Sequence, residues 1–118
     1  GGVSLAISLS FTADCVVAFG VTIVPGRILA VVIVWHTFAI MIDSIHNCPT
    51  WSHAERLRNF RLLASCIPDC NSITTFIAGD LNFGLDCLRV RSGKVDSTIA
   101  PVHKGLSELW DRMFPGFY

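Results

Sequence analysis

Charged side chains are scarce in the first half of this 118-residue sequence. Residues 1–54 contain only Asp14, Arg27 and Asp43, and the other fifteen charged residues all lie in residues 55–118. A small domain that stands alone must expose much of its surface to water. We therefore expect the first half to be the interior of something larger, or a membrane segment, and the chain to be a fragment cut at both ends.

The sequence also lacks an apolar run long enough for a membrane helix. The longest run, Ile28 to Ile42, is interrupted by His36 and Thr37, and a spanning helix needs about 20 apolar residues. This run and the preceding one, Val16 to Val24, are rich in Val and Ile, which favour strands. Buried strands and no membrane partner are therefore expected, with a membrane-associated segment as the alternative.

No excess of basic residues is present, because nine Lys and Arg balance nine Asp and Glu. This balance excludes a protein that coats nucleic acid by charge alone, but not an enzyme that cuts nucleic acid. The five cysteines are odd in number and irregularly spaced, which favours reduced, intracellular thiols over a disulfide scaffold. Cys66 and Cys70 lack the second matching pair that a zinc site needs.

Hydrophobic patterns predict five strands. Period-two alternation predicts the first, and dense apolar runs predict the others. Val24-Pro25-Gly26-Arg27 is typical of a type II turn with Gly at the position of positive φ, so the strands on either side of it are expected to be antiparallel. The predicted strands cover residues 3–11, 16–24, 28–35, 38–45 and 73–78.

Two helices are predicted as well. Ser52 and Glu55 form a capping-box pattern that opens a helix ending near Cys66, and residues 102–113 form the second helix, whereas residues 84–101 are expected to be irregular. Because the last strand returns after a helix, it is expected to lie parallel to the strand before that helix. The predicted fold class is α/β (α+β), with a mixed, mostly antiparallel sheet and flanking helices.

Polar clusters follow two of the predicted strands. Ser44-Ile45-His46-Asn47 follows one, and Gly79-Asp80-Leu81-Asn82 follows the other. If these strands are parallel, both clusters emerge at the carboxyl edge of the sheet, where open sheets bind ligands. An Asp with a nearby Asn and His can orient a water, accept its proton and hold an anionic oxygen.

Residues 76–83, with the tetrad Gly79-Asp80-Leu81-Asn82, resemble the Gly-Asp-Phe-Asn motif of the endonuclease/exonuclease/phosphatase superfamily, the deoxyribonuclease I-like proteins. Residues 1–7 resemble the glycine-led strand of that family, and residues 24–31 and the strand ending at His46 follow in the expected order. The resemblance covers most of the chain and is closest to the endonuclease domains of non-LTR retrotransposons. It implies that residues 1–118 are part of a two-sheet, four-layer α/β sandwich.

The resemblance also implies a Mg²⁺-dependent phosphodiesterase, with Mn²⁺ as a substitute, whose partner is DNA and whose location is nuclear. Asp80 would orient or deprotonate the attacking water, Asn82 would hold that water and the phosphate, and His46 would donate a hydrogen bond to a phosphate oxygen. Asp80 and Asn82 are the candidate metal ligands. Arg89 and Arg91 are candidates for contact with the phosphate backbone. No obligate protein partner is expected.

The sequence departs from the family pattern at several points. Ser44 stands where many members have Asn, and Leu81 replaces the Phe of the tetrad. The metal-binding Glu of the family and its final Asp-His pair have no counterpart in the 118 residues, so we expect this polypeptide alone to hydrolyse nothing at a useful rate. A phosphatase or deadenylase relative that acts on another phosphoester and a non-catalytic remnant are the alternatives.

Overall fold

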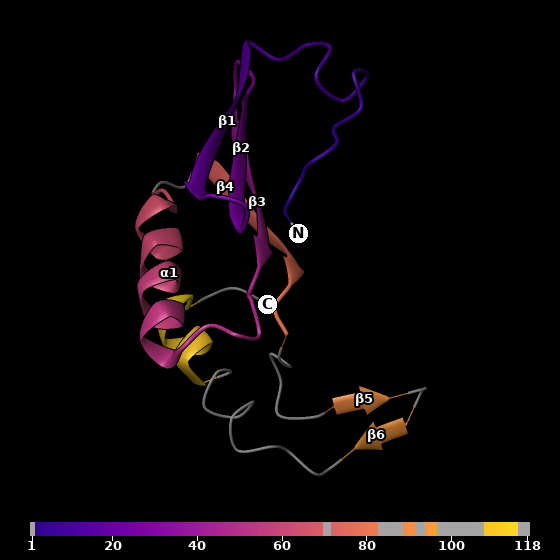
Figure 1. The fold of residues 1–118 in the computed structure, drawn as a ribbon. Helices are drawn as coiled ribbons and strands as arrows, with labels where there is room; N and C mark the ends of the chain where they lie inside the picture. Colours follow the sequence, from indigo (N-terminus) through magenta and orange to yellow (C-terminus); the bar gives the residue numbers. More distant parts are fainter. Residues whose placement is uncertain (1, 70–71, 83–88, 92–93, 97–107, 116–118) are drawn as a thin grey trace. The chain divides into compact units, whose positions relative to one another are not determined.

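The structure is a computed structural model that describes all residues except 1, 70–71, 83–88, 92–93, 97–107 and 116–118 (Figure 1). The chain divides into two units, Gly1–Asp80 and Leu81–Tyr118. Each unit is described by itself.

A four-stranded mixed sheet forms the centre of the first unit, in the order β1-β2-β3-β4. β1, β2 and β3 are an antiparallel meander, and β4 pairs with β3 in parallel. Helix α1, His53–Cys66, connects β3 to β4, as a parallel pairing requires. The predicted mixed sheet and its parallel return are confirmed. The strands are β1 (Val17–Val24), β2 (Ile28–Val34), β3 (Ala39–His46) and β4 (Ile73–Asp80).

The turn between β1 and β2 has the predicted geometry. Gly26 has φ 69°, and the N–H of Arg27 donates to the carbonyl of Val24 at 3.0 Å. Pro25 supplies the fixed negative φ before the glycine, as in a type II turn. Arg27 is therefore held at a fixed point just before β2 begins.

The predicted strand over residues 3–11 is wrong. Residues 2–7 are extended but pair with no strand of the described part of the chain, and residues 9–14 are turns and bends. Val3, Leu5 and Ile7 are nevertheless less exposed than the residues between them. Alternating apolar residues show only that one side of an extended chain faces protein. A segment that packs on the face of a sheet has the same pattern, although it has no hydrogen-bonded neighbouring strand.

Helix α1 begins with the predicted capping box. The N–H of Glu55 donates to the Ser52 hydroxyl at 3.2 Å, and the N–H of Ser52 donates to the Glu55 carboxylate at 2.7 Å. The Ser52 backbone N–H, with help from its hydroxyl, lowers the pKa of Glu55. The helix ends at Cys66, ahead of Pro68, because a residue before proline avoids the helical conformation.

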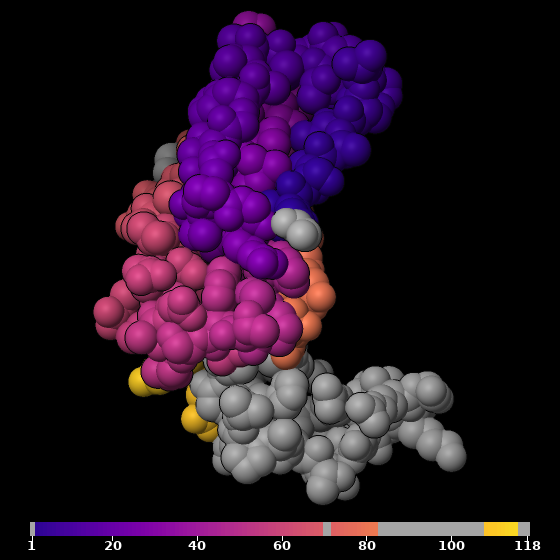
Figure 2. All heavy atoms as spheres, in the orientation of Figure 1, coloured from indigo at the N-terminus to yellow at the C-terminus, as the bar shows by residue number. Residues whose placement is uncertain are grey.

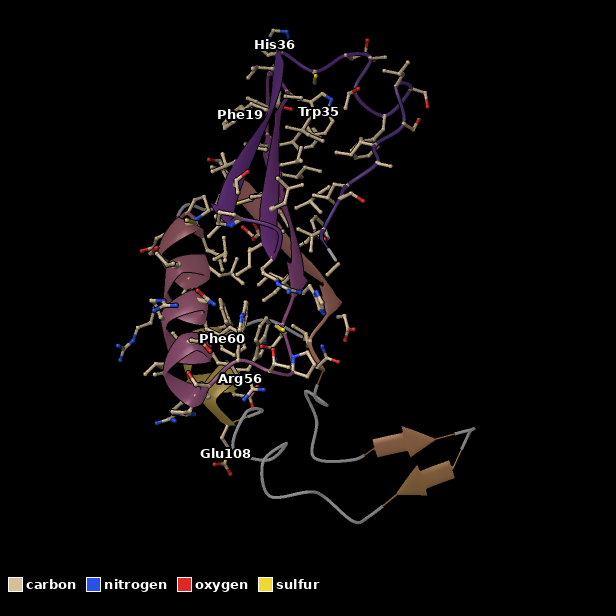
Figure 3. All side chains as sticks on the ribbon, viewed as in Figure 1. Phe19, Trp35, His36, Arg56, Phe60 and Glu108 are labelled. Carbon is tan, nitrogen blue, oxygen red and sulfur yellow. The ribbon has the colours of Figure 1, made fainter. Side chains whose placement is uncertain are left out.

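The two faces of the sheet are covered by different segments. α1 lies on one side, and the N-terminal segment lies on the other (Figure 1). Phe11 of this segment packs edge-on against Trp35, which is labelled in Figure 3, with ring centroids 5.6 Å apart. Trp35 also stacks on Phe38 at 4.7 Å. The alternate residues of β3 on the side of α1 are buried: Ala39, Met41, Asp43 and Ile45.

The second unit contains a hairpin that the sequence analysis missed. β5 (Arg89–Arg91) pairs antiparallel with β6 (Lys94–Asp96), where an irregular loop was expected. Two short alternating runs separated by Ser92-Gly93 in the sequence are a hairpin signal, but each run has a single apolar residue. Residues 108–113 are helical, as predicted, and residues 102–107 lie outside the described residues.

Cys15, Cys48 and Cys66 are free thiols, and Cys70 and Cys87 lie outside the described residues. Across the described part of the chain, no helix has the length and the apolar character needed to cross a bilayer.

β1 is an edge strand of the four-stranded sheet and carries exposed apolar side chains. Val17, Phe19 and Val21 are 45%, 47% and 41% exposed, and residues of β1 and β2 form much of the surface visible in Figure 2. Such an edge can pair with the edge of another molecule, because its outer N–H and C=O groups have no neighbouring strand. We therefore expect the chain to self-associate through β1.

We expect Phe19→Lys to reduce this self-association, because a charged side chain on an edge strand opposes edge-to-edge pairing. The measurement is sedimentation velocity at several protein concentrations. Ser10→Lys is the matched control, since Ser10 is exposed and lies outside the sheet, so that variant adds the same charge elsewhere. Equal association of the two variants would show that β1 is not the contact.

Candidate functional site

The two predicted polar clusters meet at one edge of the sheet. β3 and β4 run parallel, and His46 lies directly opposite Asp80 in the register. Paired residues of neighbouring strands have side chains on the same face, and the strands are about 4.8 Å apart. The N–H of Asn47 donates to the Asp80 carbonyl at 2.9 Å, which joins the two strand ends. The expectation that both clusters emerge at the same carboxyl edge is confirmed.

A hollow of about 380 Å³ lies at this edge. His46 is half-buried and Asp80 is exposed, so both are accessible to a small anion. The start of the N-terminal segment also lines the hollow, although it is extended chain and not the predicted strand. The lining residues are Gly2, Val3, Ser4, Ser44, Ile45, His46, Gly79 and Asp80.

Arg27 is a neighbour of His46 that the sequence analysis did not include. Arg27 Nη1 lies 2.6 Å from His46 Nδ1, and the N–H of His46 donates to the Arg27 carbonyl at 2.8 Å. The signal was present in the sequence, since Arg27 follows the turn of the meander and the meander brings this point beside the end of β3. The register, however, was not known.

Gly79 allows β4 to approach β3 at the site. It lies opposite Ile45 in the register and has φ 136°, which L side chains rarely adopt. A Cβ at this position would collide with the carbonyl oxygen of Ile45 and lie 2.9 Å from its backbone N and C. Glycine is therefore required for the pairing that sets Asp80 beside His46.

The segment after β3 is electropositive. The pKa of the Cys48 thiol is lowered, first by its hydrogen bond with the Thr50 side chain, then by the Thr50 backbone and by the charges of Arg27 and Arg56. Arg56 also donates to the Pro49 carbonyl at 3.0 Å. The charges of Arg27 and Arg56 thus act on this segment, whereas the charged side chain among the described residues that line the hollow, besides His46, is the Asp80 carboxylate.

Three predicted residues belong to the second unit. Asn82 has φ 54°, a left-handed conformation that Asn tolerates better than most residues. Arg89 and Arg91 lie on β5, and the side chains of β5 are outside the described residues. Their predicted contacts with phosphate stay predictions.

Two of the other three histidines also lie in the first unit, and His103 lies outside the described residues. His36 is in the turn between β2 and β3, at the other end of β3 from His46 (Figure 3), and His53 is the first residue of α1.

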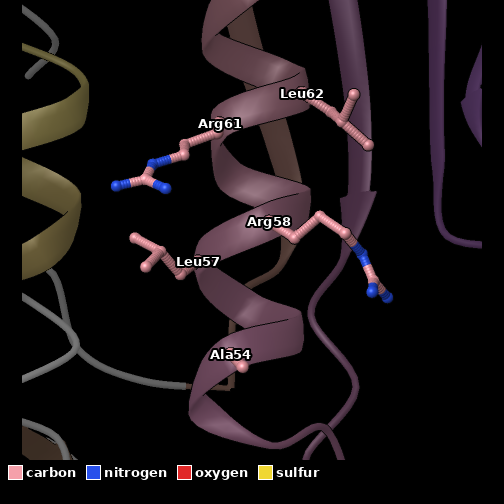
Figure 4. A pocket seen from close by; sticks show the side chains of 5 residues that line it. All are labelled: Ala54, Leu57, Arg58, Arg61 and Leu62. Carbon is pink, nitrogen blue, oxygen red and sulfur yellow. The ribbon is translucent and has the colours of Figure 1, made fainter.

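A hollow of about 350 Å³ lies on α1 (Figure 4). Its lining has no group that acts as a nucleophile or base at neutral pH: Ala54, Leu57, Arg58, Arg61 and Leu62.

A metal site is not complete in the described part of the chain. Mg²⁺ prefers oxygen ligands in an octahedral arrangement, and among the described residues Asp80 is the only carboxylate that lines the hollow. No group of three His, Cys, Asp or Glu side chains that could hold a metal was found among the described residues. The residues present therefore do not fit a whole Mg²⁺ site.

Comparisons with family models, with curated proteins and with solved structures found no match. The assignment of a function therefore depends on the residues and on their geometry.

Proposed function

We propose that the chain is part of a metal-dependent phosphodiesterase of the endonuclease/exonuclease/phosphatase type, and that the intact protein is a retrotransposon-type DNA endonuclease acting in the nucleus. The observation that supports this most is the pairing of His46 with Asp80 on parallel strands. The glycine-led segment that resembles the family lines the same hollow. In this proposal the four-stranded sheet is one of the two sheets of a four-layer sandwich.

The chemistry proposed for the hollow uses both strand ends. The Asp80 carboxylate accepts a proton from the attacking water or orients that water. The His46 ring donates a hydrogen bond to a phosphate oxygen and stabilises the negative charge that develops there. Because neighbouring strands are about 4.8 Å apart, one phosphate group can contact both side chains.

The proposal includes a metal ion but assigns it only one role. When bound, Mg²⁺ would offset charge on the phosphate. The described residues do not fit a whole site, so no step is assigned to the ion. The assignment of Asp80 and Asn82 as ligands of the ion stays a prediction. To complete the metal site, a further carboxylate is needed from outside the described residues.

The test is nicking of supercoiled DNA in the presence of Mg²⁺. The 118-residue chain is expected to leave the DNA intact, and the same chain expressed with the sequence that flanks it in its gene is expected to nick. In the longer protein, Asp80→Asn should lower the rate by at least about 100-fold, because a positioned base contributes 10²- to 10⁴-fold. Hydrolysis of a phosphomonoester but not of DNA would favour the phosphatase alternative.

Asp69→Asn is the matched control for the nicking test. Asp69 is exposed and precedes β4, so it lies at the opposite end of that strand from Asp80 and the variant makes the same change of charge. An equal loss in the two variants would contradict a specific role for Asp80. Nicking by the 118-residue chain that is lost in Asp80→Ala would contradict the expected dependence on the flanking sequence.

A further inference from the structure

The structure places three polar residues in a row across three strands. His46 lies opposite Asp80 on β4. On the other side of β3, Ile45 pairs with Ile28 on β2. Arg27, the residue before Ile28, lies beside His46, and its carbonyl accepts from the His46 N–H at 2.8 Å. Opposite residues of paired strands have side chains on one face, so His46 and Asp80 share the face that the hollow occupies, and Arg27 reaches the His46 ring from the turn before β2.

Arg27 contacts the ring of His46 from the side away from Asp80. The distance from Arg27 Nη1 to His46 Nδ1 is 2.6 Å, which is within hydrogen-bonding range. Arg27 is itself held at two backbone points, since its N–H donates to Val24 and its carbonyl accepts from His46. Arg27 is not among the residues that line the hollow, whereas His46 is.

The chemistry of this contact decides where the proton of His46 lies. A guanidinium group has five N–H donors, no acceptor, and keeps its proton in proteins. His46 Nδ1 must therefore accept, and in a neutral imidazole whose Nδ1 accepts, Nε2 carries the hydrogen. Nε2–H is then the group that can donate to a ligand.

We infer that Arg27 is a positioning residue that holds His46 as the neutral Nε2–H tautomer, with Nε2–H as the donor to a phosphate oxygen. The tautomer follows from the contact with Arg27 alone, and only the identity of the ligand rests on the proposed function. Arg27 acts through His46 and touches neither the phosphate nor the water. A merely structural role, in which Arg27 only ties the turn to the end of β3, predicts no effect on the tautomer.

The experiment reads the tautomer directly. The full chain is labelled with ¹⁵N-histidine, and long-range ¹H–¹⁵N spectra are recorded at mildly alkaline pH. The wild-type chain and Arg27→Lys, which keeps a donor without an acceptor, are expected to show His46 with hydrogen on Nε2. In Arg27→Glu the carboxylate can only accept, so the hydrogen is expected to move to Nδ1.

Two further variants guard this result against simple loss of fold. Arg27→Met keeps an unbranched side chain that has no donor, and a mixture of the two tautomers is expected. Arg56→Glu makes the same change of charge at a residue that bonds the Pro49 carbonyl and not His46, and the Nε2–H tautomer is expected to persist. An unchanged tautomer in both Arg27→Glu and Arg27→Met would overturn the inference.

Titration with inorganic phosphate separates the inference from the proposed function. Phosphate is expected to shift the His46 Nε2 signal in the wild-type chain and in Arg27→Lys, and to bind at least about tenfold more weakly to Arg27→Glu, since a lost charge-assisted hydrogen bond costs about 1.5–3 kcal/mol. If the tautomer moves as expected but phosphate shifts nothing, the positioning role stands and the phosphate site fails. If phosphate shifts Nε2 equally in all variants, the positioning role fails and the phosphate site stands.

Discussion

The free energy of unfolding is expected to fall by about 2 kcal/mol between about pH 4 and pH 6 because of one buried carboxyl group, that of Asp43. Asp43 is 0% exposed on β3, and neither of its carboxylate oxygens has a hydrogen-bond partner in the described part of the chain. Its register neighbours are Ala30 on β2 and Ile77 on β4. Burial in these surroundings raises its pKa from 3.8 to about 6.

The sign follows from which state binds the proton more tightly. The folded chain holds the proton of Asp43 up to about pH 6, whereas the unfolded chain releases it near pH 3.8. The contribution of Asp43 to stability is therefore complete below about pH 4 and is lost as the pH rises towards 6. Above that pH, the folded state carries a buried carboxylate without compensation.

Urea unfolding at a series of pH values measures this effect. Asp43→Asn has nearly the same shape and no titration, so the difference between its pH dependence and that of the wild-type chain isolates the contribution of Asp43. Glu55, whose pKa is lowered, is retained in both proteins and cancels from the difference. Identical pH profiles of the two chains would show that Asp43 is not buried as described.

Gly79→Ala is expected to destabilise the fold by at least about 3 kcal/mol, because the change combines strain at a positive φ with a collision inside the sheet. The new Cβ would overlap the carbonyl oxygen of Ile45, so β4 would have to move away from β3. Binding at the hollow should weaken as well, since the same pairing sets Asp80 beside His46. The measurement is the free energy of unfolding from denaturant titration.

Gly20→Ala provides the control for this change. Gly20 also lies in a strand of the sheet, but a Cβ there would meet only the carbonyl oxygen of Ala30 at 3.8 Å, which is ordinary contact. Its effect is expected to stay within about 1 kcal/mol, the usual range for glycine and alanine in a strand. A similar loss of stability in the two variants would contradict the close approach at Gly79.

Much of the sheet could be predicted from local patterns in the sequence. The apolar runs, the Pro25-Gly26 turn and the capping box at Ser52 each follow from the conformational preferences of a few adjacent residues. The parallel return of β4 follows from chain connectivity, because a helix separates it from β3. These local preferences and the connectivity are sufficient to predict that His46 and Asp80 meet at one edge of the sheet.

Contacts between residues that are far apart in the sequence could not be predicted. The contact between Arg27 and His46 depends on the register of β2 against β3, and alternation does not determine that register when both faces are apolar. Asn47 belongs to a polar cluster in the sequence, but it is fully buried and its backbone N–H joins the ends of two strands. Residues 3–11 alternate like a strand, yet a strand also needs a neighbour, and the pattern within a segment cannot report one.

The parallel pairing of β3 with β4 also affects the order in which the chain can fold. The meander of β1, β2 and β3 closes through short turns, whereas His46 and Asp80 are separated by the whole of α1. Closing that longer loop costs more conformational entropy, which must be offset before the contacts form. The hollow is thus completed after the meander, and during synthesis on the ribosome it cannot exist until β4 has emerged.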